Sequence, residues 1–528
     1  MSVSQDTARG AHFRRRDYRD RPLPDWQTAR LQLPVPTLPD LPGAEPAYWK
    51  AWELAFAHTR RPLHGGTLVS NYVDTCTEGR LRLWDAAATS LYCNLAHDLL
   101  PAVRSLDNFY RAQHPDGEIC VELEPDGGDR EPWINREGLP LFSRRTGRAA
   151  DLGRTAPVPE LTLDGSGPPL LAWAEREAYR HTGDSVRVRE VWEALLAHHT
   201  AIVTHLRHVN GLYVSDGFTM ENSPRNAQLG CGIDISCQMV LSARCLAELA
   251  PVAAREAEAD GQRSEGIAMR RAGTALAQEA EDTAAAIRNQ MWDEDTGFFY
   301  DLRGDGQRSP VMTAAAFWAL LAGVATSAQA DRLAAALEDP RTFLRPHRLP
   351  SLAASMPGYD PRGGFWRGAV WPPLVPVVTR GLERYGHGAL AHAIALNHIQ
   401  AVAEVCAETG TLWENYAAEA TAPGRPARPD FVGWSGLGPI LLLLEYGIGL
   451  RANAALHELT WEVRDTGYLA CERYLFGRTR VDVEAIGRSA PEDPLQITVT
   501  ADRPIRLIVR VAGRERILRV TGRQELTI

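Results

Sequence analysis

The sequence predicts a mainly α-helical protein with a short N-terminal arm and a small C-terminal antiparallel β module. Two observations predict this fold class. Between about residues 94 and 450, apolar residues recur every three to four positions, and after residue 451 they alternate with polar residues. The chain has 528 residues, of which 45% are apolar and 23% charged. It is therefore long enough to bury a large core.

Residues 1–65 are predicted to form an extended arm that wraps around a domain. This stretch is rich in Pro, Arg and Asp, and LPVPTLPDLPG is its clearest helix-breaking run. The first twenty residues contain no apolar core of a secretory signal, and we find no apolar run long enough to span a bilayer. We therefore expect a soluble, cytoplasmic protein.

Residues 66–450 are predicted to form the helical body. Helices are expected to begin near Pro168, Ser185, Ile235 and Gly266, and the segments 313–339 and 388–410 also have apolar residues at helical spacing. The loops between them carry Gly, Pro, Asp and Trp. Such a series fits either an array of helix bundles or a closed helical toroid.

Residues 451–528 are predicted to form the β module. The segments DPLQITVTADRP and LIVRVAGRERILRVTGRQELTI alternate β-branched and polar residues, with short Gly and Pro turns between them. This length suits a few short strands. We expect the module to pack against the helical body.

Charge and motif content exclude several classes of function. The formal net charge is −9, and Arg14–Arg16 is the one basic run, which argues against nucleic-acid binding. The eight cysteines form no CxxC pair and the histidines form no HExxH, so no metal is expected. Lys50 is the single lysine, which removes Schiff-base chemistry, and we expect no organic cofactor. No membrane partner is expected, and a homodimer stays open.

Several of the 14 tryptophans lie in loops beside acidic or glycine residues. The loop sequences are LWDAAATSLY, GGFWRGAVWPP, TLWENYAAE and FVGWSGLGP. Sugar rings stack their apolar faces on aromatic side chains, while carboxylates, Arg and Asn bind their hydroxyls. A single tryptophan of this kind fits core packing better, but four such loops together predict a sugar-binding cleft.

Two carboxylates in these loops suit cleavage of a glycosidic bond. Glu221 lies in GFTMENSPRN and Glu414 in TLWENYAAE. Such cleavage needs an acid that protonates the leaving oxygen and a second carboxylate on the opposite face. If the second carboxylate activates water, the two lie roughly 6.5–9.5 Å apart and the reaction inverts the anomeric centre. Taken alone, each glutamate fits a helix-end cap or an ion pair better than a catalytic role.

The order of these motifs resembles a known superfamily. PPLLAW, NSPRN, FWRGAVW, ENY and GWSGLGP follow one another as in the inverting glycoside hydrolases related to trehalase, mannosyl-oligosaccharide glucosidase and mannosylglycerate hydrolase. The resemblance covers roughly Val69 to Leu450. It implies an (α/α)6 toroid with the active site at its loop-rich end.

The resemblance also implies roles for individual residues. Glu221 matches the general acid and Glu414 the general base. Arg225 is expected to form an ion pair that holds the acid loop, while Tyr416 fits a hydrogen bond to base or sugar and core packing equally well. The resemblance implies a substrate-binding role for Trp84, Asp85, Trp366, Arg367, Gly368, Trp371 and Trp434, and the predicted substrate-binding set also includes Asn222, Arg225 and Tyr416.

One departure leaves the acid open. The superfamily usually has Asp before Asn-Ser-Pro-Arg, whereas this chain has Glu221. The extra methylene moves the proton by about one bond length, and catalysis is sensitive to a misplacement of about 1 Å. Asp216 in VSDGF is the alternative acid. The sequence thus predicts inverting hydrolysis of a small α-linked glucoside or mannoside. A sugar epimerase or isomerase on the same toroid, or a carbohydrate-binding protein that has lost hydrolysis, are the alternatives.

Overall fold

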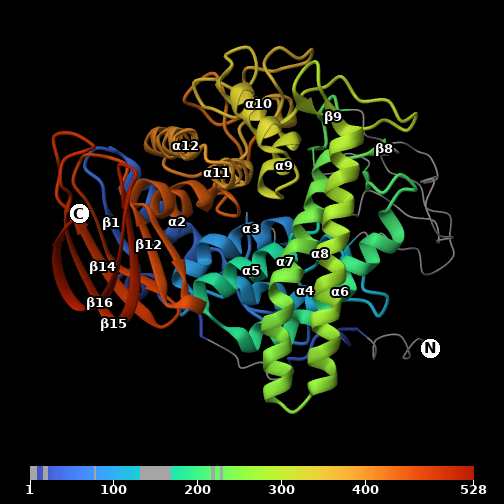
Figure 1. Ribbon diagram of the computed structural model, residues 1–528, viewed down its shortest axis with the longest axis horizontal. Coiled ribbons are helices and arrows are strands. Elements are labelled where there is room, and N and C mark those ends of the chain that lie inside the picture. Colours follow the sequence, from blue (N-terminus) through green and yellow to red (C-terminus); the bar gives the residue numbers. More distant parts are fainter. Residues whose placement is uncertain (1–8, 16–21, 76–78, 131–167, 216–219, 226–229) are drawn as a thin grey trace.

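The computed structural model describes residues 9–15, 22–75, 79–130, 168–215, 220–225 and 230–528. Figure 1 shows a helix-rich body with a β sheet on one side of it, at the left of the view. The helix-rich body and the C-terminal strands confirm the broad fold class that the sequence predicts.

The helices of the body begin close to where their sequence patterns begin. The predicted starts at Pro168, Ser185, Ile235 and Gly266 correspond to helices α5, α6, α7 and α8, and the 388–410 pattern to α12. The helices of the body are α3 (Leu83–Cys93), α4 (Asp107–Ala112), α5 (Leu171–Thr182), α6 (Ser185–Leu206), α7 (Ile233–Ala259), α8 (Arg263–Met291), α9 (Trp318–Leu321), α10 (Ser327–Glu338), α11 (Leu374–Arg384) and α12 (Gly388–Thr409).

The 313–339 pattern is broken in the structure rather than continuous. It divides into η5 (Ala314–Phe317), α9 and α10. Gly323 has φ +71°, a left-handed conformation that ends a helix. Thr326 then caps α10, because its side chain accepts from Gln329 N while the Gln329 side chain accepts from Thr326 N. Periodicity misses this break because the apolar spacing continues across it.

The body contains an inner series of contacting helices. Helix α3 contacts α5, α5 contacts α7, α7 contacts α9 and α9 contacts α11. The helical segment η8 (Gly438–Ile448) contacts α3, the first helix of this series. Segment η8 is a π-helix. The 3-10 segments of the described chain besides η5 are η1 (Asn94–Ala96), η2 (Ala102–Leu106), η6 (Phe365–Arg367), η7 (Ser435–Leu437) and η9 (Ala454–Leu456).

Helix α7 lies in the centre of the body. By length and composition it could cross a membrane, but 78% of its most apolar 18-residue window is buried inside the protein. Core helices of soluble proteins can have the same length and apolar composition. Within the described residues no other helix is long and apolar enough to cross a membrane.

The C-terminal strands form one sheet that the N-terminal segment completes. Strand β1 (Val35–Thr37) pairs with β13, so the sheet runs β1-β13-β14-β15-β12-β11, with β16 on the other side of β15. All pairs are antiparallel except β12 with β15, which is parallel. The first half of the long β15 pairs with β14, and its second half extends past β14 and pairs with β12. The strands are β11 (Leu450–Asn453), β12 (Glu458–Glu462), β13 (Leu469–Phe476), β14 (Thr479–Ala485), β15 (Gln496–Val511) and β16 (Arg514–Thr527).

The N-terminal segment differs from the extended arm expected for it. It contains α1 (Trp26–Arg30) and the 14-residue helix α2 (Ala44–Ala57), which packs on α12 and η8. The aromatic side chains of α2 explain this, because Tyr48 and Trp52 are fully buried and their removal from water stabilises the helix against the body.

Short strand pairs connect the helices at the loop-rich side of the body. Two of these strands, β4 (Leu81–Arg82) and β5 (Glu122–Leu123), bring charged side chains to the pocket described below. The short strands are β2 (Thr59–Arg60), β3 (Tyr72–Val73), β4, β5, β6 (Asp129–Arg130), β7 (Val214–Ser215), β8 (Gly230–Cys231), β9 (Trp292–Asp293) and β10 (Phe298–Phe299).

Candidate active site

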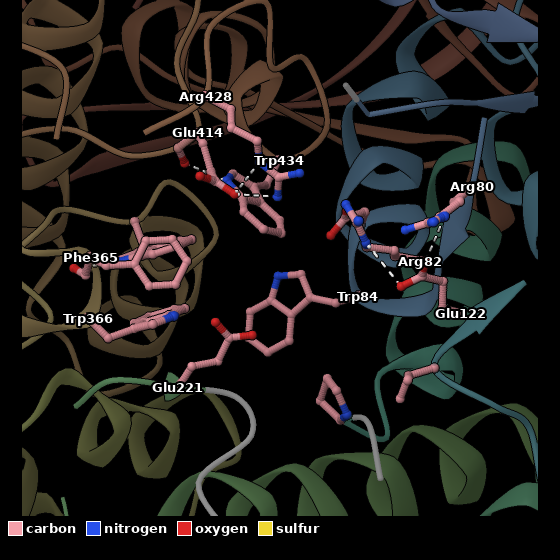
Figure 2. Close-up of a pocket in the computed structure, with 14 residues that line it drawn as sticks. Arg80, Arg82, Trp84, Glu122, Glu221, Phe365, Trp366, Glu414, Arg428 and Trp434 are labelled. Atoms are coloured by element: carbon pink, nitrogen blue, oxygen red, sulfur yellow. Dashed lines mark hydrogen bonds and ion pairs between the residues drawn. The ribbon is translucent and has the colours of Figure 1, made fainter. Parts of the chain in front are cut away.

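A cavity of about 370 Å³ opens where the inner helices begin, and we call it the tryptophan pocket. Figure 2 shows Glu414 and Glu221 on opposite sides of it, with the ring of Trp84 near its middle, Phe365 and Trp366 on a third side and Arg80, Arg82 and Glu122 on the fourth. Its lining consists of Arg80, Arg82, Trp84, Asp85, Val121, Glu122, Pro168, Glu221, Phe365, Trp366, Trp371, Glu414, Arg428 and Trp434.

Helix α3 brings Trp84 and Asp85 to the pocket in its first turn. Asp85 is 2% exposed and accepts a hydrogen bond from Thr75 Oγ1 at 2.9 Å. Burial raises the pKa of Asp85 to about 6, against the opposing effects of Arg82, the Thr75 hydrogen bond and Arg428. Nearby Glu414 adds to the rise. Asp85 thus takes up a proton within the physiological range of pH.

Glu414 lies in the loop after α12 and is 3% exposed. Its Oε1 accepts two hydrogen bonds from Arg428, from Nη2 at 2.7 Å and from Nε at 3.1 Å. The backbone is fixed as well, because Glu414 N donates to Arg428 O at 3.0 Å and Trp434 Nε1 donates to Glu414 O at 2.7 Å. These contacts hold the carboxylate in one orientation at the pocket wall.

The loop that carries Glu221 is tied to the tryptophan wall by its neighbour. Asn222 Nδ2 donates to Gly364 O at 2.9 Å, and Trp366 N donates to Asn222 Oδ1 at 2.9 Å. These two hydrogen bonds join the loop of Glu221 to the FWRG loop.

The far end of the acid loop is anchored by a buried ion cluster. The Arg225 side chain is 1% exposed and lies between two carboxylates, Asp234 at 2.7 Å and Asp301 at 2.5 Å. Asp234 lies in the first turn of α7, and Asp301 also accepts from Ile233 N at 2.9 Å. The predicted ion pair of Arg225 is thus present, and it joins the loop to the start of α7.

Stacked aromatic rings form one wall of the pocket. Trp366 and Trp371 are parallel, with ring centroids 3.8 Å apart, and Trp434 follows at 5.6 Å from Trp371. The backbone before them is unusual, because Phe365 has φ +62° although it carries a side chain. Such strain is found at functional sites, where the surrounding structure holds it.

Seven of the sequence-predicted residues meet at the pocket: Trp84, Asp85, Glu221, Trp366, Trp371, Glu414 and Trp434. Asn222 and Arg225 do not line the pocket, but they hold the loop of Glu221 through the contacts described above. Asp216, the alternative acid, lies outside the described residues.

Arg367, Gly368 and Tyr416 are not among the residues that line the pocket. Arg367 is exposed and its Nε donates to Gly358 O at 3.0 Å. Gly368 is a packing position, since a Cβ there would lie 2.6 Å from Asp360 O. Tyr416 is fully buried, and Trp413 N donates to its hydroxyl at 3.2 Å, so core packing is the role that its position shows.

Sequence reasoning missed the charged side of the pocket and one arginine beside Glu414. Arg80, Arg82 and Glu122 come from two-residue strands and the turn before them, which are too short for periodicity to detect. Arg428 lies 14 residues after Glu414 in an irregular loop. The only available signal was the run GRPARPD itself, which has no spacing typical of a site.

The described residues contain no group of three or more His, Cys, Asp and Glu side chains that could hold a metal. The described lining of the tryptophan pocket contains no histidine. The buried histidine pair, His347 and His398, lies elsewhere, with Nε2 of one 2.9 Å from Nδ1 of the other. Burial lowers the pKa of His347 to about 3, so this ring is neutral.

Comparison with known proteins gives relatives among glycoside hydrolases. A periplasmic trehalase of Xanthomonas oryzae pv. oryzae is 33% identical over 196 residues, which cover 36% of this chain and 32% of the trehalase. The chain thus matches about a third of that protein's length. An uncharacterised protein of Borreliella burgdorferi is 24% identical over 391 residues, or 72% of this chain and 74% of that protein.

Solved structures show the same kind of fold. The GH63 mannosylglycerate hydrolase from Thermus thermophilus in complex with glucose has a TM-score of 0.53 and 19% identity, and the match covers 75% of this chain and 99% of that chain. A GH78 family rhamnosidase of Bacillus sp. GL1 has a TM-score of 0.57 and 16% identity over 89% of this chain and 41% of that chain.

The family comparison covers the tryptophan pocket from α3 to η7, with Arg80 and Arg82 just outside the matched range. Residues 83–435 match the family model described as the mannosylglycerate hydrolase MGH1-like glycoside hydrolase domain. The matched range contains Asp85, Glu221, Glu414 and the stacked tryptophans, and it spans more than half of the chain. The protein therefore belongs to this glycoside hydrolase family.

Proposed function

We propose that the protein hydrolyses a small α-linked glucoside or mannoside with inversion of the anomeric centre, with Glu221 as the general acid and Glu414 as the general base. The observation that supports this most is that both glutamates line one pocket from opposite sides (Figure 2). An inverting hydrolase needs this arrangement, with the glycosidic bond and the attacking water between the two carboxyl groups.

In this mechanism Glu221 gives its proton to the glycosidic oxygen as the bond to the anomeric carbon breaks. Glu414 takes a proton from a water molecule, whose oxygen bonds to the anomeric carbon from the opposite face. The products are the free alcohol and a sugar of inverted configuration. Arg428 keeps Glu414 oriented, and Asp85 is placed to bind a sugar hydroxyl.

We also infer that the body is an (α/α)6 toroid. The contacts from α3 through α5, α7 and α9 to α11, together with the contact of η8 with α3, support a ring of inner helices. Outer helices such as α6, α8 and α12 alternate with them along the chain.

The size and chemistry of the tryptophan pocket support a small, soluble substrate. A volume of about 370 Å³ is at the small end of ligand pockets, and the parallel rings of Trp366 and Trp371 offer a surface for a sugar ring. The relatives named trehalase and mannosylglycerate hydrolase bear the names of small glycosides, which is the same substrate class. We propose that the protein meets this substrate in the cytoplasm.

The described lining favours hydrolysis over epimerisation. An epimerase acting on free sugars would need two bases that titrate near neutrality, often histidines. The described lining holds carboxylates and arginines instead. The following experiment distinguishes a hydrolase from a carbohydrate-binding protein that has lost hydrolysis.

The test is release of reducing sugar from a panel of trehalose, kojibiose, glucosylglycerate and mannosylglycerate, for wild type and for Glu221→Gln and Glu414→Gln. We expect one class of substrate to be cleaved and each variant to be slower by about 100- to 10,000-fold. Glu408→Gln, which changes an exposed glutamate on α12, serves as the control.

Two results would contradict the assignment. Full activity in Glu414→Gln would remove the proposed base. Full activity in Glu221→Gln with loss in Asp216→Asn would move the acid to Asp216. Sugar binding without any cleavage would favour the binding protein.

A further inference from the structure

A second cavity lies at the opposite end of the inner helices, and we call it the arginine cavity. Its volume is about 530 Å³. Helix α3 begins with Trp84 and Asp85 at the tryptophan pocket and ends with Leu91 at the arginine cavity. Because an 11-residue helix is about 16 Å long, the two cavities are separate places for a ligand.

The arginine cavity has more arginines than carboxylates. Six arginines and four glutamates line it. His181 also lines it but adds no charge near neutral pH, because burial lowers its pKa to about 3. The four glutamates are matched by four of the arginines, in the pairs Arg380–Glu445 at 2.5 Å, Arg176–Glu177 at 2.7 Å, Arg180–Glu248 at 2.8 Å and Arg451–Glu383 at 2.8 Å.

The two remaining arginines, Arg244 and Arg384, converge on Gly323. A Cβ atom on Gly323 would lie 2.5 Å from Arg244 Nη1 and 2.6 Å from Arg384 Nε. Arg244 pairs at 2.5 Å with Glu281, which is 59% exposed and outside the cavity lining. In the described part of the chain Arg384 forms no ion pair. Among the arginines of the cavity, Arg384 is therefore the one without a carboxylate partner in the described structure, and Arg244 lies beside it.

Helix ends account for only part of this arrangement. Carbonyls at helix C-termini carry partial negative charge and attract arginines, and Arg244 Nη1 indeed donates to Gly323 O at 2.9 Å. A second guanidinium at the same glycine is not needed for that role, and two like charges so close repel each other. An anion between them would relieve this repulsion.

We propose that the arginine cavity binds a small phosphate monoester whose phosphate group lies between Arg244 and Arg384. Guanidinium groups donate several hydrogen bonds in a planar fork that suits phosphate oxygens. A phosphate group there would pair with Arg384, which has no carboxylate partner in the described part of the chain, and would share Arg244 with Glu281.

The rest of the cavity suits a hydroxylated body attached to this phosphate. The volume is well above that of a phosphate group alone. Asn94 lines the cavity and is 2% exposed, and its Oδ1 has no hydrogen-bond partner in the described structure, so it is available to accept from a hydroxyl. We therefore expect a sugar phosphate to bind more tightly than inorganic phosphate.

The experiment is isothermal titration calorimetry of the full chain with glucose 6-phosphate, inorganic phosphate and glucose. We expect glucose 6-phosphate to bind and inorganic phosphate to bind more weakly, whereas any binding of glucose should be unchanged in Arg384→Gln. Arg384→Gln should weaken glucose 6-phosphate binding at least about ten-fold, because a charge-assisted contact is lost. Arg384 is exposed, so the variant is expected to fold.

Two control variants locate the site. Arg478→Gln, at an exposed arginine between β13 and β14, should bind as wild type. Arg80→Gln with Arg82→Gln, at the tryptophan pocket, should also keep glucose 6-phosphate binding. Absence of binding, wild-type binding by Arg384→Gln, or loss of binding only in the Arg80 and Arg82 variant would each overturn the proposal. Because the readout is binding, the result does not depend on whether the protein is a hydrolase.

Discussion

Arg428 holds the carboxylate of Glu414 through a single oxygen, Oε1, which accepts from Nη2 at 2.7 Å and from Nε at 3.1 Å. Arg428 is 41% exposed while Glu414 is 4% exposed at its side chain. The pair thus joins the buried carboxylate of Glu414, the base in the proposed mechanism, to the open side of the pocket. Within the described residues Arg428 binds only Oε1 of this carboxylate.

Removing this arginine should reduce turnover without unfolding the protein. In Arg428→Gln the Glu414 side chain loses two charge-assisted contacts, and a small misplacement of a catalytic group is costly. We expect kcat to fall by about ten- to a hundred-fold, with partial recovery in Arg428→Lys. Arg425→Gln, an exposed change in the same loop, should be neutral in steady-state kinetics. An equal effect at both positions would contradict the role of Arg428.

The titration of Asp85 should be visible in stability. Its pKa is raised from 3.8 to about 6 by burial, so ionisation destabilises the folded state. The penalty is absent below about pH 4, grows between pH 4 and 6, and is fully present above pH 6, where it is about 3 kcal/mol. Asp85→Asn removes it.

The free energy of unfolding of Asp85→Asn minus that of wild type should therefore be about 2–3 kcal/mol larger at pH 8 than at pH 4. Urea unfolding of both proteins at the two pH values measures this difference. Equal differences at the two pH values would show that Asp85 has an ordinary pKa.

The bridge between the acid loop and the tryptophan wall should matter for catalysis more than for stability. Asn222→Ala removes the contacts to Gly364 O and Trp366 N, and we expect kcat to fall about ten-fold. Asn397→Ala is the matched control, because Asn397 makes two similar backbone contacts, to Arg348 N and Pro346 O, far from the pocket. If kcat falls to the same extent in both variants, the loss reflects a general effect on folding and not the contacts of Asn222.

The ion cluster behind the acid loop should contribute strongly to stability. Arg225→Met leaves the carboxylates of Asp234 and Asp301 buried without their cation. Breaking such a buried pair costs about 3–5 kcal/mol. In comparison, Arg270→Met breaks an exposed pair with Glu258 and should cost less than about 1 kcal/mol. Denaturant unfolding of the two variants compares them directly, and similar losses would contradict this account.

The sequence predicted those parts of the site that sit in distinctive motifs. Trp84, Glu414 and Trp434 lie in tryptophan-containing motifs that the sequence marked as loops, and the resemblance added Asp85. The structure places Trp84 and Asp85 in the first turn of α3 instead of a loop. The charged side of the pocket was not predictable in this way. Arg82 and Glu122 are adjacent because β4 pairs with β5, forty residues further along the chain, and no local pattern reports such a contact.

The helices likewise divide into those that the sequence pattern predicts and those that it misses. Helix α12 follows an uninterrupted helical pattern and was predicted over its full length. The break at Gly323 was hidden because apolar spacing continues through it. Helix α2 was missed because the proline-rich run before it dominated the N-terminal segment, while Tyr48 and Trp52 make its decisive contacts with distant parts of the chain.

The central claim is that Glu221 and Glu414 act from opposite faces of one sugar. Proton NMR of the anomeric region, recorded in the first minutes of cleavage of an α-linked substrate, tests it most directly. The account predicts that the β-anomer appears first and that Glu414→Gln abolishes its release. First appearance of the α-anomer would show retention, and it would contradict the roles assigned to both glutamates.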